Sequence, residues 1–159
     1  MDIYLVRHGE YVDLGSKTLE QDSQNRLSVE GVAKLQRQAK TLAAWQIPVE
    51  QIVASPFVRA KQTAEILADG IGVSIDEHVA LTRTFFNMAG LTQILQEYAD
   101  TKHLMLVGHE SDLSTVAADV IGGGKLELAR GGIIRIALDT IDPPQGSLIW
   151  LLSPDVMNA

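Results

Sequence analysis

Short apolar segments that end in polar clusters alternate with helical segments along most of the chain. Ile3 to Val6 is the first such segment, and it stops at Arg7-His8-Gly9. Gln51 to Ala54 and His103 to Val107 are two further segments of this kind. Apolar runs of this length are typical of strands that are buried on both faces. Their alternation with helices predicts an α/β fold, a three-layer α/β/α sandwich around a mostly parallel central sheet.

The spacing of apolar residues between these strands predicts the helices. One begins after Ser28, whose side chain is expected to cap it, and ends near Trp45. Ser55-Pro56 is expected to cap and start the next helix, because proline is favoured at the first helical position, and that helix stops at Gly70. Two more helices are predicted, over residues 90–99 and from Ser111 to Ile121.

The remaining strands are expected to complete the sheet. Val73 to Ile75 predicts a short strand. Ile133 to Leu138 and Ser147 to Leu152 predict a closing hairpin, which adds an antiparallel strand near the C-terminus. Pro143-Pro144 and Gly146 are expected to turn the chain between the two strands of this hairpin.

Composition limits the class of protein. The 159 residues suit a single domain over residues 1–159, and a hydrophobic share of 46% is enough for a core. The net charge of −7 argues against a nucleic-acid partner. Because there is no cysteine, disulfides, thiolate catalysis and thiolate metal sites are excluded. No signal peptide and no membrane-spanning segment is visible, so we expect a cytoplasmic protein without a membrane partner. The oligomeric state stays open.

Three polar clusters follow predicted strands and carry the chemistry: Arg7-His8, the stretch from Ser55 to Arg59, and His109-Glu110. The carboxyl ends of parallel strands meet at one edge of a sheet, where ligands bind. Two of the clusters also open helices, whose free backbone N–H groups favour an anion.

These residue types suit a phosphoryl group. Arg7 and Arg59 offer planar forks that match phosphate oxygens. His8 is a nucleophile if its imidazole is neutral, and the neighbouring arginines should disfavour its protonated form. We expect His109 to be protonated and to stabilise the transition state. No cofactor or metal is needed, since Glu10, Glu110 and Asp112 are not at a metal-binding spacing.

Three motifs carry a resemblance to a known family. Leu5-Val6-Arg7-His8-Gly9-Glu10 resembles the signature of the histidine phosphatase (phosphoglycerate mutase-like) superfamily. Ser55 to Ala64 resembles its second motif, and Val107-Gly108-His109-Glu110 resembles its third. The short length is similar to that of the compact SixA-type phosphohistidine phosphatases. The resemblance covers roughly residues 1–152, with the motifs in the right order and at the right strand ends.

The resemblance implies a role for each matching residue. His8 would accept the phosphoryl group and form a phosphohistidine intermediate, which water then hydrolyses. Arg7, Arg59 and His109 would bind the phosphate together with His8. Ser55 would orient Arg59 or touch the edge of the pocket, although it is also a candidate helix cap.

The general acid of the family departs from the pattern. Many relatives place a glutamate where this chain has Val79-Ala80-Leu81-Thr82-Arg83, which contains no carboxylate. Glu77, slightly upstream, and Glu110 are alternative candidates. A third interpretation is that no strong acid is needed, because a phosphohistidine has a good leaving group. The missing acid therefore favours a phosphohistidine substrate over a sugar phosphate.

Three functions remain open at this point. The first is a phosphatase that removes phosphate from a protein phosphohistidine. The second is a phosphomonoesterase for a small phosphorylated metabolite, which the polar segment 11–27 would cover as a loop, lid or flap. The third is a non-catalytic phosphate-binding module.

Overall fold

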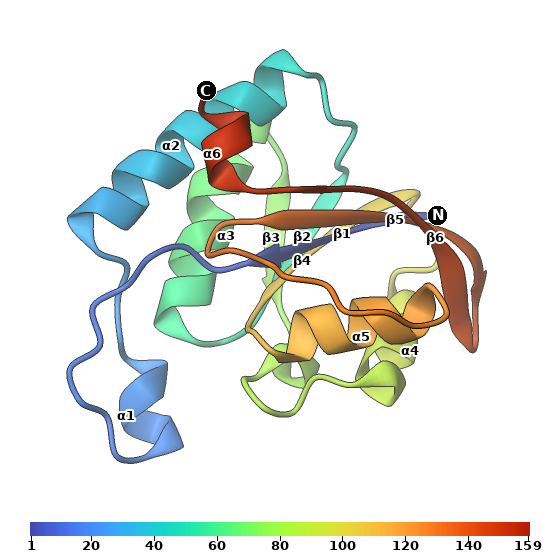
Figure 1. Cartoon of the computed structure of the whole chain (residues 1–159), viewed down its shortest axis with the longest axis horizontal. Helices are drawn as coiled ribbons and strands as arrows, with labels where there is room; N and C mark the ends of the chain where they lie inside the picture. The colour runs from blue at the N-terminus through green and yellow to red at the C-terminus, as the bar shows by residue number, and fades with distance from the viewer.

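The computed structural model describes all 159 residues. The fold is built around one six-stranded sheet (Figure 1). The strand order is β3-β2-β4-β1-β5-β6. The first four strands in this order are parallel, whereas β5 is antiparallel to β1 and β6 is antiparallel to β5. The predicted sheet, mostly parallel with an antiparallel strand near the C-terminus, is confirmed. The strands are β1 (Asp2–Arg7), β2 (Gln51–Ala54), β3 (Ser74–Glu77), β4 (His103–Gly108), β5 (Ile133–Ile141) and β6 (Pro144–Leu152).

Helices cover both faces of the sheet. They are α1 (Leu19–Ser23), α2 (Val29–Ala44), α3 (Val58–Ile71), α4 (Met88–Glu97), α5 (Asp112–Val120) and α6 (Pro154–Met157), with a 3-10 turn at Val79–Leu81. Figure 1 shows α2, α3 and α6 on one face and α4 and α5 on the other, so the predicted three layers are confirmed. No helix is long and apolar enough to cross a membrane.

The apolar runs follow from burial on both faces. In β1, Tyr4 and Val6 pack in the cluster under α2 and α3, while Ile3 and Leu5 pack in the cluster under α4 and α5. Successive side chains of a strand point to opposite faces, so a strand covered on both sides has no position left for a polar residue.

The expected start of α3 is wrong. Ser55 does not cap this helix, which begins at Val58 with Phe57 at the capping position and no side-chain cap. The Ser55 hydroxyl lies at the end of β2, fully buried, where it accepts from the Phe57 N–H (3.2 Å) and bonds the ring of His109 (2.8 Å). Ser55 therefore bonds His109, which the tertiary structure brings beside it, and does not cap the first turn of α3.

The closing hairpin is longer than expected. Its strands reach Ile141 and restart at Pro144, so Pro144 and Gly146 belong to β6 and not to the turn. Gly146 pairs with Leu138, and a side chain there would overlap the Ala137 carbonyl. Gly146 therefore permits close approach of two strands, which a sequence pattern does not distinguish from a turn.

Residues 11–27, named here the lid segment, form an ordered excursion. Its two ends meet, because Tyr11 and Leu27 form a β-bridge and the Val12 N–H donates to the Arg26 carbonyl (3.0 Å). Between these ends lies α1, whose first turn is capped by the Thr18 hydroxyl. The segment therefore carries one short helix away from the sandwich on two adjacent stems, as the blue part of Figure 1 shows.

The start of α2 holds the loop that follows β1. The Glu10 carbonyl accepts from the Ser28 N–H (3.0 Å), and Ser28 caps α2 as predicted by accepting from the Gly31 N–H. A methyl group at Gly31 would overlap the Glu10 carbonyl oxygen. Gly31 thus allows helix and loop to approach closely, next to the residues that follow β1.

We expect Gly31→Ala to lower the free energy of unfolding by about 1–3 kcal/mol, because overpacking outweighs the better helix propensity of alanine. Denaturant unfolding measures this change. The matched control is Gln36→Ala on the exposed part of the same helix, which should change stability little. Equal stability of Gly31→Ala and the wild type would contradict the close approach.

Candidate active site

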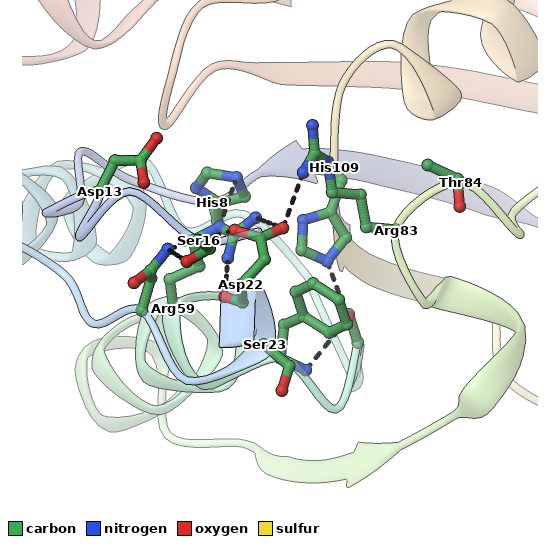
Figure 2. A network of polar contacts seen from close by, with 12 residues as sticks. His8, Asp13, Ser16, Asp22, Ser23, Arg59, Arg83, Thr84 and His109 are labelled. Carbon is green, nitrogen blue, oxygen red and sulfur yellow. Dashed lines mark hydrogen bonds and ion pairs between the residues drawn. The ribbon is translucent and has the colours of Figure 1, made fainter. Parts of the chain in front are cut away.

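The polar clusters after β1, β2 and β4 meet at one edge of the sheet, as expected for adjacent parallel strands. The rings of His8 and His109 lie 5.2 Å apart between centroids. Arg59, from the first turn of α3, places its Nε 3.2 Å from Nε2 of His8. Figure 2 shows these side chains pointing toward one another, although they come from distant parts of the chain.

Hydrogen bonds assign the proton on the His8 ring. Nδ1 of His8 lies 2.9 Å from the Gly9 carbonyl oxygen, which only accepts, so Nδ1 carries the hydrogen. Nε2 accepts from Nε of Arg59 and therefore holds the lone pair. A neutral imidazole with its lone pair on Nε2 is the form that can attack phosphorus.

The charge state of His8 agrees with this arrangement. Burial, together with the positive charges of Arg59, Arg7 and Arg130, lowers the pKa of His8 to about 3. The bond to the Gly9 carbonyl opposes this shift but is outweighed. No separate base is needed to keep the His8 ring unprotonated near neutral pH.

His109 differs from the expectation of a protonated ring. Burial lowers the pKa of His109 to about 2, and the neighbouring charges of Arg59 and Arg83 act in the same direction, so the ring is neutral here. Its Nε2 bonds the Ser55 hydroxyl (2.8 Å), while its Nδ1 is buried without a partner. If Ser55 donates to Nε2, then Nδ1 carries a hydrogen that a phosphate oxygen can accept.

Arg59 is enclosed on all sides and is only 1% exposed. Besides Nε, its Nη1 donates to the backbone carbonyl of Asp22 (2.8 Å) and its Nη2 to the Asp22 carboxylate (3.2 Å). The rings of Tyr11 and Phe57 lie 4.3 Å and 5.2 Å from its Cζ. These contacts hold a buried cation, which would otherwise be costly.

Arg7 lies on the other side of the pocket. Its Nη1 donates to the Leu128 carbonyl (2.9 Å), and its Nε is buried without a partner. Burial lowers the pKa of Arg7, and the nearby charge of Arg130 acts in the same direction. The charge of Glu110 opposes this shift but is outweighed. The buried Nε–H of Arg7, which lacks a partner, can donate to an anion.

The interpretation of the sequence missed three residues at this site. Tyr11 packs on the ring of His8 (5.2 Å) and over Arg59, Arg130 adds positive charge, and Asp22 bonds Arg59. Tyr11 and Asp22 belong to the lid segment, which has no periodicity that would place it. Their polarity alone did not distinguish them from solvated loop residues.

The two candidate acids lie in different settings. Both carboxylate oxygens of Glu110 accept from Ser114, from its N–H (2.9 Å) and from its hydroxyl (2.7 Å). The Glu110 carboxylate is thus held by Ser114 in the first turn of α5. Glu77 is exposed on the edge strand β3 and pairs with Lys61.

Comparison with known proteins decides the family. The family model for the histidine phosphatase superfamily (branch 1) matches residues 3–111. The chain belongs to this superfamily. An uncharacterized protein of Picosynechococcus sp. is 30% identical over 144 residues, which cover 86% of this chain and 84% of that protein. The mitochondrial serine/threonine-protein phosphatase Pgam5 of Drosophila ananassae is 38% identical over 65 residues, or 41% of this chain and 21% of that protein.

Solved structures of other histidine phosphatases share the fold. The protein histidine phosphatase SixA, complexed with tungstate, matches with a TM-score of 0.85 at 22% identity, over 99% of each chain. The alpha-ribazole phosphatase from Shigella flexneri matches with a TM-score of 0.74 at 15% identity, over 97% of each chain. These likenesses show the shared fold. Membership of the histidine phosphatase superfamily makes the chain a phosphatase, a hydrolase, which disfavours the non-catalytic module considered as a third function.

The depressed pKa of His8 predicts a pH dependence of stability. The folded protein keeps His8 neutral down to about pH 3, whereas the unfolded chain binds this proton below its ordinary pKa of 6.5. The contribution is fully present above pH 6.5 and is lost as the pH falls toward 3. When the pH falls from 7 to 5, the free energy of unfolding should fall for both proteins, and the fall should be roughly 2 kcal/mol smaller for His8→Asn than for the wild type. Denaturant unfolding at the two pH values measures this difference. Equal losses would contradict a buried neutral His8.

Proposed function

We propose that this phosphatase removes phosphate from a phosphohistidine on a protein, with His8 as the nucleophile. Arg7, Arg59 and His109 would bind the phosphoryl group, and Ser55 would orient His109. The observation that carries the choice of substrate is that each carboxylate at the site is already held by hydrogen-bond donors.

Asp22 bonds the same arginine as the nucleophile, and it is a poor acid. Burial raises its pKa, but hydrogen bonds from Arg83 and Arg59 outweigh burial and lower it overall. Asp22 is therefore ionised, and Glu110 has both oxygens on Ser114. An alkoxide leaving group would need a protonated acid, which contributes a factor of about 10² to 10⁴ to the rate.

A phosphohistidine substrate removes that requirement. His8 Nε2 attacks phosphorus while the P–N bond to the substrate breaks, and the substrate imidazole, protonated on its other nitrogen, leaves as a neutral ring. Water then attacks the phosphorus on His8, which releases inorganic phosphate and restores Nε2. Arg7 and Arg59 would stabilise the charge on the equatorial oxygens in both steps.

The alternative substrate is a small phosphorylated metabolite. A cavity of ≈ 260 Å³ next to the site is lined by residues of the lid segment and by Arg83. His8 and His109 are 4% and 2% exposed, so the lid segment must move before a bulky substrate can enter. A metabolite panel that gives kcat/KM of about 10⁴ M⁻¹s⁻¹ or more would favour this alternative.

We expect wild-type protein to release phosphate from a phosphohistidine-bearing protein and His8→Ala to release it at least about 10³-fold more slowly, because the nucleophile is lost. Phosphate release over time measures this. Lys40→Ala, at an exposed position of α2 away from the site, is the matched control and should release phosphate at the wild-type rate. Equal rates for wild type and His8→Ala would rule out the proposal.

Glu110→Gln separates a proton donor from a helix contact. If Glu110 only bonds Ser114, the rate on phosphohistidine should fall less than about tenfold, while the free energy of unfolding falls by about 1 kcal/mol. Both are measured on the same preparation. A rate loss of two orders of magnitude or more, with the fold intact, would identify Glu110 as the acid.

A further inference from the structure

Asp22 holds two arginines at once. One carboxylate oxygen, Oδ2, accepts from Nη1 of Arg83 (2.7 Å) and from Nη2 of Arg59 (3.2 Å). Figure 2 shows the Asp22 carboxylate between the guanidinium groups of Arg59 and Arg83. Two cationic donors converging on one anionic oxygen is the arrangement that also binds an oxygen of a phosphoryl group.

Asp22 also closes off Arg59. Each of the three guanidinium nitrogens of Arg59 already donates, Nε to His8 and the other two to Asp22. The rings of Tyr11 and Phe57 lie against the same group. Withdrawal of Asp22 would free one N–H on Nη1 and one on Nη2 for the oxygens of a phosphoryl group, and attack by Nε2 of His8 would release Nε of Arg59 as well.

The partner able to withdraw is Asp22. It lies in α1 on the lid segment, which leaves and rejoins the body through the adjacent stems at Tyr11 and Leu27. A cavity beside Asp22 is lined by residues of the lid segment and by Arg83. Displacement of α1 would expose Arg59, Arg83 and both histidines together.

We propose that the Asp22 carboxylate is an internal stand-in for the phosphoryl group, and that Arg83 binds this group once it has displaced Asp22. This inference rests on the proposed phosphatase site and adds one residue to it. Arg83 would then be a binding residue and not an ordinary surface arginine. Its side chain is 45% exposed, so it can reach an entering substrate before α1 has moved fully.

The charge balance supports the exchange. Arg7, Arg59, Arg83 and Arg130 surround the pocket, and Asp22 is the carboxylate that bonds two of them. A phosphoryl group carries more negative charge than one carboxylate and has more acceptor oxygens. It would also accept from Nε of Arg7 and Nδ1 of His109, the two buried site atoms that lack partners.

A structural role for Asp22 makes the opposite prediction. If Asp22 only positions Arg59, removing its carboxylate should weaken phosphate binding. If Asp22 competes with phosphate for Arg59 and Arg83, removing its carboxylate should strengthen phosphate binding. The probe is inorganic phosphate, titrated by calorimetry at neutral pH into the full chain. We expect Asp22→Asn to bind phosphate about tenfold more tightly than the wild type, the size of one charged hydrogen bond. Weaker or unchanged binding would overturn the proposal.

The role of Arg83 is tested in the Asp22→Asn background, where Arg83 no longer has a carboxylate to anchor. Adding Arg83→Gln should weaken phosphate binding about tenfold relative to Asp22→Asn alone. Unchanged binding would show that Arg83 serves Asp22 and not the phosphate. Thermal unfolding checks each variant, and Asp22→Ala repeats the test should Asp22→Asn not fold.

Two matched variants control for net charge. One is Glu20→Gln, at a residue of α1, the helix that carries Asp22. The other is Arg37→Gln, at an exposed residue of α2. Both should leave phosphate binding within about twofold, because screening limits distant charges. The binding test does not need turnover: a chain that binds phosphate as expected but hydrolyses no phosphohistidine contradicts only the proposed function.

Discussion

A guanidinium group that is 1% exposed, that of Arg59, is the constraint on which the site depends. Burying a cation is costly unless hydrogen bonds and nearby π systems replace water. The structure supplies acceptors from the end of β1 and from the lid segment, and aromatic rings from both sides. The position of α1 and the orientation of His8 follow from meeting this requirement.

The same cation contributes to the charge state of the histidines. Burial is the main cause that depresses the pKa of His8 to about 3 and that of His109 to about 2, and the charge of Arg59 adds to both shifts, so both rings are neutral. A neutral His8 has the lone pair that a nucleophile needs. A neutral His109 still donates one hydrogen, and incoming negative charge would offset the cations around it. The negative charge of a phosphoryl group would balance the positive charges of the arginines around both histidines.

Asp22 bears both on which substrate the enzyme can use and on how that substrate reaches the active site. As an ionised carboxylate it is not an acid, which favours a substrate with a good leaving group. As a partner of Arg59 and Arg83 it occupies the N–H groups that a phosphoryl group would bind, so under the proposed exchange α1 moves when the substrate enters. The superfamily fold is shared by a protein histidine phosphatase and by alpha-ribazole phosphatase, so the fold alone does not choose between protein and metabolite.

By itself, the sequence determined the alternation of the strands with helices α2 to α5, the mostly parallel sheet and the meeting of Arg7, His8, Arg59 and His109 at one edge, but not the short helices α1 and α6. These follow from short-range periodicity and from the geometry of parallel strands. Three features depend on the tertiary structure alone. Ser55 bonds His109 and does not cap α3, the His109 ring is neutral, and Asp22 lies against Arg59. Asp22 meets Arg59 across 37 positions of sequence, from a segment without periodicity. No local pattern encodes such a contact, because it is selected by the demands of a buried charge and not by backbone preference.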